Sequence, residues 1–421
     1  MSERSLPWWA SPVGINIGFL LPMLMLIAWV GDSSLEGLTV RGIWFLNGRY
    51  IVLAVVLLLT TSLGGWIGSQ VVASKPSHRE EDQDRWNLAA MIVGVVAMLA
   101  YLFFFKSYLA DPHLLFATLT GRFRPDRSNL ETAVGITSLE NMAPVFFSIY
   151  GYRLATRAKS ISLYMHLLCA ALLVLTALRV YAWSERLALI EVTLPLGLAA
   201  SMRLAQSPNR LPRLISRMGP VIALPALTFY FGIAEYFRSW TAALYNGRTG
   251  FWEFALGRLA SYYVTSLNNG AALLGTSDWP TFKFQNTLAW LHALPGLGPE
   301  FTSYVGSYPG QYGIFLATYE DSEFTNPSGI FSVIFDLGLP LGVAYFALVG
   351  IAGGMFFRAY RSGSLVGVLF YPLLFLTFLE VFRYPYLGGQ RAFTWVLGIV
   401  IALAVGRHFS STVASRTAVA A

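Results

Sequence analysis

The sequence has little charge. Of its 421 residues only 12% are Asp, Glu, Lys or Arg, whereas soluble domains carry roughly 25%. Such a low share excludes an ordinary soluble enzyme. The chain also has a single cysteine, Cys169, which lies in an apolar run. One cysteine supports neither an internal disulfide bond nor a cysteine-based metal site.

Several signatures of catalysis are also missing. No glycine-rich phosphate loop ends in Gly-Lys-Ser or Gly-Lys-Thr, which argues against ATP hydrolysis on this chain. The Gly-x-Ser-x-Gly signature of many serine hydrolases does not occur. The five histidines are scattered without metal-ligand spacing. We therefore expect no metal centre and no cofactor.

What the sequence does contain is hydrophobic residues, which make up 55% of the chain. Several apolar runs are long enough to cross a bilayer, which takes about 20 residues of helix. We therefore predict an all-α fold, a polytopic membrane bundle of about ten transmembrane helices. The ten runs lie at 13–30, 50–72, 88–105, 139–155, 161–178, 187–203, 218–237, 328–351, 365–381 and 392–407.

Basic residues indicate how these runs are oriented. When the N-terminus is placed in the cytoplasm, the inner segments carry cations at roughly twice the density of the outer segments, as the positive-inside rule requires. The arginine cluster at 203–217 is the strongest check on this orientation. Adding or removing one run before it would place the cluster outside. The sequence thus predicts that both termini are cytoplasmic.

The predicted outer segments differ greatly in length. Residues 1–237 hold the first seven predicted transmembrane helices, residues 328–421 hold the last three, and residues 238–327 form a single outer loop between them. A loop of this length with many aromatic residues is expected to fold. Within it, the spacing of apolar residues predicts amphipathic helices at 251–267 and 282–293, on the outer membrane surface.

Arginines occur on the predicted outer side, where the insertion rule makes them scarce. Arg179 and Arg186 flank the segment between the fifth and sixth runs, and Arg383 and Arg391 flank the one between the ninth and tenth. Guanidinium groups stay charged and match phosphate bidentately, so we expect these side chains to bind substrate. The alternative is that each guanidinium simply reaches the lipid head groups. Weaker candidates for the same role in the outer loop are Arg248, Arg258 and Lys283.

Two residues are competing candidates for a catalytic base. Asp336 lies inside the eighth run, where a carboxylate requires a partner or a water-lined cavity. Histidine is a suitable base near neutral pH, which makes His292 the other candidate, and a histidine held by a loop carbonyl is the structural alternative. Glu380 and Arg383 are three residues apart, and we favour a structural ion pair across one helical turn for them.

Two stretches carry a resemblance to a known family. Residues 258–270 read RLASYYVTSLNNG within the predicted outer loop, and residues 325–338 read TNPSGIFSVIFDLG and lead into the eighth run. Together with the many apolar runs and the long outer loop, they resemble the O-antigen polymerases (Wzy class), within the wider O-antigen polymerase and ligase superfamily. The likeness extends over residues 180–390, and the first third of the chain shares only hydropathy.

This resemblance implies a GT-C-like fold in which the outer loop roofs a cavity open to lipid. It also implies a glycosyltransferase of the bacterial inner membrane, which polymerises oligosaccharide repeat units carried on undecaprenyl pyrophosphate at the periplasmic face, without a metal. On this interpretation the pyrophosphate is held by Arg186, Arg258, Arg383 and Arg391. Sugar rings would stack on Tyr262, Tyr263 and Trp279.

The resemblance also implies partners and leaves alternatives open. The partners are the lipid-linked oligosaccharide, membrane lipids and, as a candidate, a chain-length regulator; nucleic acid is not among them. An O-antigen ligase would instead move the glycan to the lipid A core. A transporter of lipid-linked sugars would favour paired helix breaks at mid-membrane, and the apolar runs show no such pairing.

Overall fold

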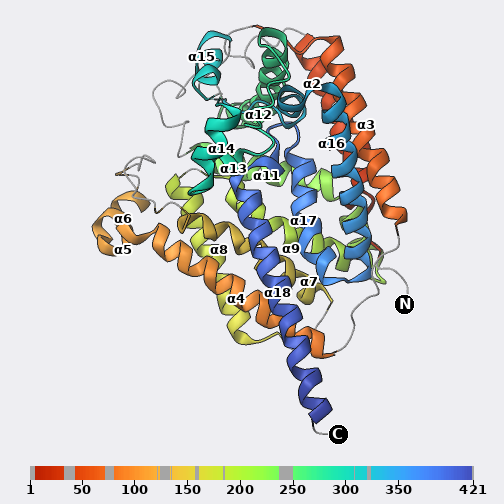
Figure 1. Cartoon of the computed structure of the whole chain (residues 1–421), viewed down its shortest axis with the longest axis vertical. Helices are drawn as coiled ribbons and strands as arrows, with labels where there is room; N and C mark the ends of the chain where they lie inside the picture. The colour runs from red at the N-terminus through yellow and green to blue at the C-terminus, as the bar shows by residue number, and fades with distance from the viewer. Residues whose placement is uncertain are drawn as a thin grey trace.

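The protein is built from helices. In the computed structural model no strand occurs among the described residues, which confirms the predicted all-α class. Figure 1 shows most of the long helices packed side by side in one bundle. The described residues are 5–32, 43–71, 80–120, 122–123, 133, 135–156, 161–183, 185–236, 250–307, 309–319 and 324–419.

The helices succeed one another along the chain as coloured in Figure 1. Those of the first half are α1 (Pro12–Ile15), α2 (Leu21–Asp32), α3 (Gly48–Gln70), α4 (Glu80–Phe104), α5 (Lys106–Ala110), α6 (Pro112–Leu119), α7 (Ala143–Ala155), α8 (Leu163–Trp183) and α9 (Leu187–Ala205). Those of the second half are α10 (Arg210–Arg217), α11 (Gly219–Glu235), α12 (Phe251–Thr276), α13 (Ala289–His292), α14 (Leu297–Val305), α15 (Pro309–Tyr319), α16 (Gly329–Ser362), α17 (Leu365–Glu380) and α18 (Gln390–Val419). Short turns of other helix types are η1 (Trp8–Ala10), η2 (Asn16–Leu20), η4 (Thr137–Met142) and η6 (Tyr386–Gly388).

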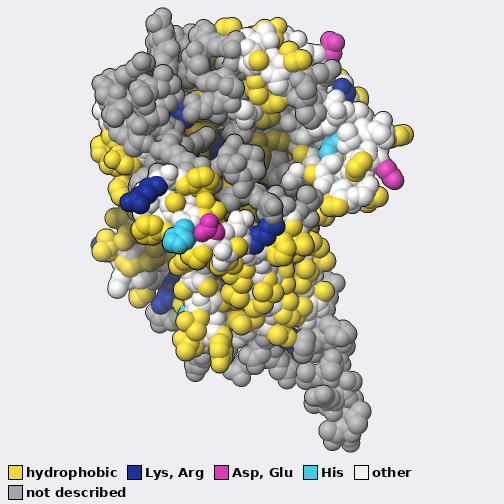
Figure 2. Space-filling view, turned by 90° about the vertical axis from the view of Figure 1, so that its left-hand side faces the viewer, with side chains coloured by type: hydrophobic (Ala, Val, Ile, Leu, Met, Phe, Trp, Pro, Cys, Tyr) yellow, Lys and Arg dark blue, Asp and Glu magenta, His cyan; other side chains and the backbone are white. Residues whose placement is uncertain are grey.

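Six helices of the described chain are long and apolar enough to cross a membrane. Helices α10 and α11, which meet at a bend of 64°, make a seventh if they are counted as one span, and α17 is shorter. On the face shown in Figure 2, hydrophobic side chains form a broad patch over the lower half of the molecule. By length and composition these are the helices of a multi-pass membrane protein. The six are Pro12–Trp29, Gly48–Gln70, Arg85–Phe104, Leu163–Trp183, Leu187–Ala205 and Gly329–Ser362.

Helices α3 and α16 approach each other through glycine. Gly64 of α3 lies against Gly350 of α16, Gly68 against Ile351, and Gly354 against Gly65, so each helix contributes a Gly-x-x-x-Gly spacing to the contact. A methyl group on Gly68 would lie only 2.0 Å from the carbonyl oxygen of Ile351. In a membrane, where lipid is as apolar as the side chains, helices associate by such close backbone packing.

Replacing Gly68 with alanine is expected to lower the free energy of unfolding by about 2 kcal/mol, because the two helices would have to separate to admit the methyl group. Gly257 of α12 is the matched control, since its Cβ position faces open space and alanine in a helix is at least as favourable as glycine. Thermal unfolding in one detergent measures both variants. Equal melting temperatures would show that close contact between α3 and α16 is not required.

Most of the predicted outer loop folds as helices α12 to α15, which lie toward one end of the molecule (Figure 1). Helix α12 begins at Phe251, as the pattern predicts, but continues beyond 267 to Thr276, and residues 264–274 are buried. The prediction of a helix over 282–293 is wrong except at α13. Phe282 and Phe284 have positive φ angles of 50° and 54°, a conformation that interrupts a helix.

Helix α16 is interrupted after Asp336, and the backbone of Thr281 and Phe282, within the predicted outer loop, fills the break. Gly338 has a φ of 76°, and Pro340 lacks the N–H that would bond to the Asp336 carbonyl. That carbonyl oxygen instead accepts a 2.9 Å hydrogen bond from the N–H of Phe282. The N–H of Thr281 donates to the carbonyl oxygen of Phe335, also at 2.9 Å. The outer segment thereby satisfies backbone groups that the break would leave unpaired.

The two stretches that carry the family resemblance pack against each other. The side-chain amide of Asn269 on α12 donates to the carbonyl oxygens of Phe324 and Asn326, at 2.7 and 3.2 Å. Gly270 lets the chains approach, because a Cβ there would lie 2.6 Å from the carbonyl oxygen of Pro327. Helix α12 therefore fixes the segment that leads into α16.

Candidate functional site

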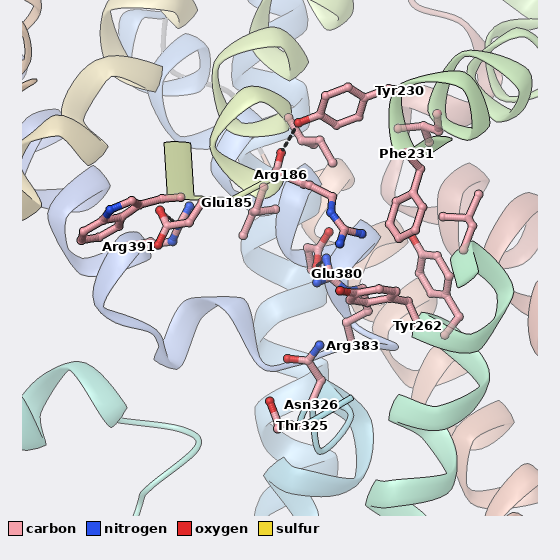
Figure 3. Close-up of a pocket in the computed structure, with 16 residues that line it drawn as sticks. Glu185, Arg186, Tyr230, Phe231, Tyr262, Thr325, Asn326, Glu380, Arg383 and Arg391 are labelled. Atoms are coloured by element: carbon pink, nitrogen blue, oxygen red, sulfur yellow. Dashed lines mark hydrogen bonds and ion pairs between the residues drawn. The ribbon is translucent and has the colours of Figure 1, made fainter. Parts of the chain in front are cut away.

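A pocket of about 470 Å³ lies where the α8–α9 hairpin, α11, α12 and the α17–α18 connection meet. Figure 3 shows Arg186, Arg383 and Tyr262 directed toward a common space, with Arg391 and Glu185 at one side. Side chains from separate segments thus converge, which is the geometry that a shared anion site requires. The predicted substrate-binding residues that line the pocket are Arg186, Tyr262, Tyr263, Arg383 and Arg391.

Arg186 is held in place by α11 and α12. Its guanidinium carbon lies 4.1 Å from the centre of the Phe231 ring and 5.0 Å from that of Tyr262. The guanidinium forms an ion pair with the buried Glu235. The hydroxyl of Tyr230 donates to the Arg186 carbonyl oxygen at 2.9 Å. Stacking on rings together with an ion pair fixes the plane of the guanidinium group.

Glu235 joins Arg186 to Arg258. Its second carboxylate oxygen accepts a hydrogen bond from Nε of Arg258 at 3.3 Å. The Arg258 guanidinium carbon lies 4.6 Å from the centre of the Phe324 ring. Arg258 is buried and does not line the pocket. Its contact with a ligand in this pocket would therefore be indirect, through Glu235 and Arg186.

On the other side of the pocket, Arg391 and Arg179 share Glu185. Arg391 donates to Glu185 at 2.7 Å and to Glu191 at 2.8 Å. Arg179 donates from Nε to the same Glu185 oxygen at 2.8 Å and lies 3.1 Å from Glu140. Arg391 lines the pocket, whereas Arg179 is buried behind it. Because Arg179 is buried among carboxylates, the alternative of a guanidinium reaching the lipid head groups does not describe it.

Arg383 keeps unused donors beside the pocket. Its Nη1 donates to Glu380 at 2.8 Å, the ion pair that the three-residue spacing predicts. Its guanidinium carbon lies 5.3 Å from the centre of the Tyr262 ring. Its Nε is buried without a hydrogen-bond partner in the described part of the chain. Since a guanidinium carries five N–H donors, Arg383 is placed to bind an added anion.

The ion pairs around the pocket balance one another in formal charge. A phosphate group would add negative charge to a neutral cluster, so its binding would depend on directed hydrogen bonds more than on net attraction. The carboxylates also hold the guanidinium groups in place before a ligand arrives. The members of these pairs among the described residues are Arg179, Arg186, Arg258, Arg383 and Arg391 with Glu140, Glu185, Glu191, Glu235 and Glu380.

Tyr262 and Tyr263 are adjacent on α12 and have different surroundings. The ring of Tyr262 lies under the guanidinium groups of Arg186 and Arg383, so part of the surface that a sugar would stack on is already covered. Burial and, to a smaller extent, Glu380 raise the pKa of Tyr263 to about 12, while Arg383 opposes the rise. Tyr263 therefore stays protonated at neutral pH and offers the pocket an O–H donor.

Asp336 lies outside the pocket and binds the backbone of the outer segment. Its carboxylate accepts hydrogen bonds from the backbone N–H groups of Asn286 and Thr287, both at 2.8 Å. The side chains of these two residues add bonds of 3.1 and 3.0 Å. Four hydrogen bonds supply the partner that a carboxylate inside an apolar helix requires. The same bonds divert two N–H groups from helix formation in the stretch 282–293.

Replacing Asp336 with alanine is expected to cost about 3 kcal/mol of unfolding free energy, because two backbone N–H groups would be buried and unpaired. Asp336→Asn is expected to keep most of the stability, since its amide oxygen still accepts from both N–H groups. Thermal unfolding of both variants tests this. Equal losses of stability in the two variants would contradict this role of the carboxylate.

His292 also lies outside the pocket. Its Nε2 donates to the carbonyl oxygen of Lys283 at 2.8 Å, and its Nδ1 lies 2.9 Å from the hydroxyl of Thr302. This is the loop-carbonyl arrangement that the sequence offers as the alternative to catalysis, and a catalytic role for His292 stays a prediction. Arg248 lies outside the described residues.

A second cavity of about 450 Å³ adjoins the pocket and has almost entirely apolar walls. This apolar groove follows α9 and α11 from the pocket to Trp9 and Ser216, near the other ends of these helices. A polar pocket beside an apolar groove suits an amphiphile with an anionic head and a hydrocarbon tail. The residues that line both cavities are Ile190, Leu227, Tyr263 and Glu380.

Sequence reasoning found the arginines of this site and, of their carboxylate partners, paired only Glu380 correctly; Glu185 and Glu235 are two of those it missed. A signal for Glu235 was present, because it lies inside the predicted seventh run and a carboxylate there requires a partner. Glu185 gave no such signal, since it lies in a short polar connection where an exposed carboxylate is normal.

No protein-family model, curated protein or solved structure matches this chain.

Proposed function

We propose that this protein is a membrane glycosyltransferase that polymerises oligosaccharide repeat units carried on undecaprenyl pyrophosphate. The observation that carries the proposal is that an arginine-lined pocket and an apolar groove lie side by side and share wall residues, because a lipid pyrophosphate needs both. The stretches 258–270 and 325–338, which resemble the O-antigen polymerases, support the same substrate class, since residues of both line the pocket.

The proposal includes a GT-C-like bundle of about ten transmembrane helices in the bacterial inner membrane. A helix occupies each of the ten apolar runs, and the arginine cluster at 203–217 supports an orientation with both termini in the cytoplasm. The pocket then faces the periplasm. Lipid-linked glycan, membrane lipids and a chain-length regulator are the proposed partners.

In the proposed reaction a hydroxyl of the acceptor sugar attacks the anomeric carbon of the donor glycan. A carbon–oxygen bond forms there while the bond from that carbon to the pyrophosphate breaks, and the electron pair leaves with the pyrophosphate. Arg186, Arg383 and Arg391 bind the departing anion. Because the leaving group is an anion at neutral pH, the reaction needs no general acid. It does need a group that accepts the proton of the acceptor hydroxyl.

Glu380 is the pocket carboxylate placed to accept this proton. Its Oε2 bonds to Arg383, and its Oε1 has no hydrogen-bond partner within the described part of the chain. Glu185, the other carboxylate in the wall, is already bonded to two arginines. We therefore assign the base to Glu380 in place of the two candidates from the sequence, both of which lie outside the pocket.

Proteoliposomes that contain the purified protein test the function. When they are supplied with fluorescent lipid-linked repeat units, they are expected to form a ladder of longer lipid-linked glycans. One molecule of undecaprenyl pyrophosphate should be released for each new linkage, which mass spectrometry of the lipid fraction measures. Vesicles without protein are the control.

The same preparation separates the alternatives. If lipid A core is supplied as well and only the core receives glycan, the protein is a ligase and the polymerase assignment fails. If labelled donor crosses the bilayer and no new linkage forms, the protein is a transporter. If neither new linkages nor transport is detected with a folded protein, the proposal of glycan transfer is overturned.

A further inference from the structure

Helix α10 has three different sides. Arg210, Arg213 and Arg217 lie along one side and are exposed, and Ser216 is buried against the bundle. A third side is apolar and also exposed, with Leu211 at 67%. An exposed apolar patch of this kind is unfavourable in water and marks a surface that contacts a membrane or a protein. Its spacing of three and four residues places its members on one helical face. They are Leu211, Leu214, Ile215 and, just beyond the helix, Met218.

Helix α10 lies at the end of the molecule opposite to the pocket. The pocket is lined by the first residues of α9 and the last turns of α11, whereas α10 joins the other ends of these two helices. Helix α9 has 19 residues, which gives a length of about 28 Å, close to the thickness of the hydrocarbon layer. The bend of 64° turns α10 away from the direction of α11. This places α10 at the membrane interface that faces away from the pocket.

Two tryptophans hold α10 at this level. The indole N–H of Trp8 donates to the carbonyl oxygen of Arg217 at 3.1 Å, and that of Trp9 to the carbonyl oxygen of Ser216 at 2.7 Å. The Ser216 hydroxyl donates to the carbonyl oxygen of Ser201 at 2.8 Å. Tryptophan is enriched at the membrane interface. The two tryptophans therefore place α10 at the interface, as the length of α9 does.

The charges of α10 select the kind of partner. Arg210 and Arg217 form no ion pair or side-chain hydrogen bond with the described residues, and Arg213 donates only to the carbonyl oxygens of Pro208 and Asn209. The sequence contains no acidic residue from 192 to 234. A row of cations beside an apolar face is complementary to anionic lipid at a membrane surface.

We propose that α10 lies in the plane of the membrane, with its apolar side in the hydrocarbon, and binds anionic phospholipid head groups through its three arginines. The inference concerns the side of the protein opposite to the pocket and does not depend on the proposed glycan transfer. In the proposed orientation the lipids belong to the cytoplasmic leaflet. The helix thus fixes the depth of α9 and α11, the two helices that line the apolar groove.

Fluorescent labels on the full-length protein test the position of α10. In a Cys169→Ala background, which removes the single native thiol, an environment-sensitive label is placed on Leu214→Cys or on Arg213→Cys. In vesicles, a spin-labelled lipid is expected to quench the first label at least threefold more than the second. Glu300→Cys on α14 is the water-facing control. Equal quenching at the two α10 positions, or a Leu214→Cys label as water-exposed as the control, would overturn the proposal and point to a protein partner.

Binding of lipid to the full-length protein tests the charge. The affinity for phosphatidylglycerol, measured by native mass spectrometry, is expected to fall about fivefold in Arg210→Gln, because one cation near an anionic surface contributes about a factor of this size. Arg122→Gln removes the same charge elsewhere and is expected to change nothing. An unchanged affinity in Arg210→Gln, or an equal loss of affinity for phosphatidylcholine, would overturn the proposal.

Discussion

Arg383→Ala is expected to slow glycan transfer by about 100-fold or more, because it removes a preorganised donor from the proposed leaving group. Arg383→Lys keeps a cation beside Glu380 but lacks the planar fork that matches phosphate, and we expect a loss of about tenfold. Initial rates of linkage formation in proteoliposomes measure both variants. Arg122→Ala, an exposed arginine outside the pocket, is the control and should retain the full rate.

The loss in Arg383→Ala has to be separated from a loss of folding. Glu380 is buried and would lose its partner, so the melting temperature of each variant is recorded with its rate. Arg383→Lys retains an ion pair and should melt close to the original protein. A folded Arg383→Ala protein that transfers glycan at the original rate would remove this arginine from the site.

Glu380→Gln is expected to lower the turnover number by about 1,000-fold, the effect typical of removing a general base. Glutamine has nearly the same shape, so binding of undecaprenyl pyrophosphate should change little. Measuring both turnover and lipid binding distinguishes a base from a residue that only positions Arg383. If Glu380 only positioned Arg383, its replacement would weaken the binding of undecaprenyl pyrophosphate together with turnover. Glu300→Gln, at an exposed position, is the control.

The assignment of Glu380 is tested against the candidates from the sequence in the same assay. His292→Gln is expected to transfer glycan at nearly the original rate, because His292 is bonded to loop groups outside the pocket. Glu380→Asp should recover part of the turnover, since it returns a carboxylate at a slightly greater distance. If Glu380→Gln kept full turnover while His292→Gln lost it, the proton acceptor would be the histidine.

The sequence predicted the helices best where hydropathy alone decides them. Each apolar run contains a helix, because a backbone in lipid must satisfy its own hydrogen bonds. The predicted end of the eighth run at 351 was too early, since α16 continues to Ser362. Amphipathic spacing located α12 and failed over 282–293. Within 282–293, distant groups on α16 accept the backbone hydrogen bonds, and no local sequence pattern indicates such a contact.

The arginines of the candidate site were predictable one by one, and their arrangement was not. Their predicted position on the outer side follows from the order of the apolar runs, so Arg186, Arg383 and Arg391 stood out in the sequence. Their partners come from distant parts of the chain, as in the ion pair of Arg391 with Glu191. Sequence distance carries no information about such pairs, because they depend on which helices become neighbours.

By itself the sequence determined that this chain is a helical membrane protein, where its helices lie and which unusual cations lie between them, since hydropathy and the cost of charge in lipid act locally. Only the tertiary structure decided which cations share a pocket, which are buried behind it, and that an apolar groove joins that pocket. The physical reason is that an ion pair or a cavity wall requires side chains from several helices at one place, and helix packing alone brings them together.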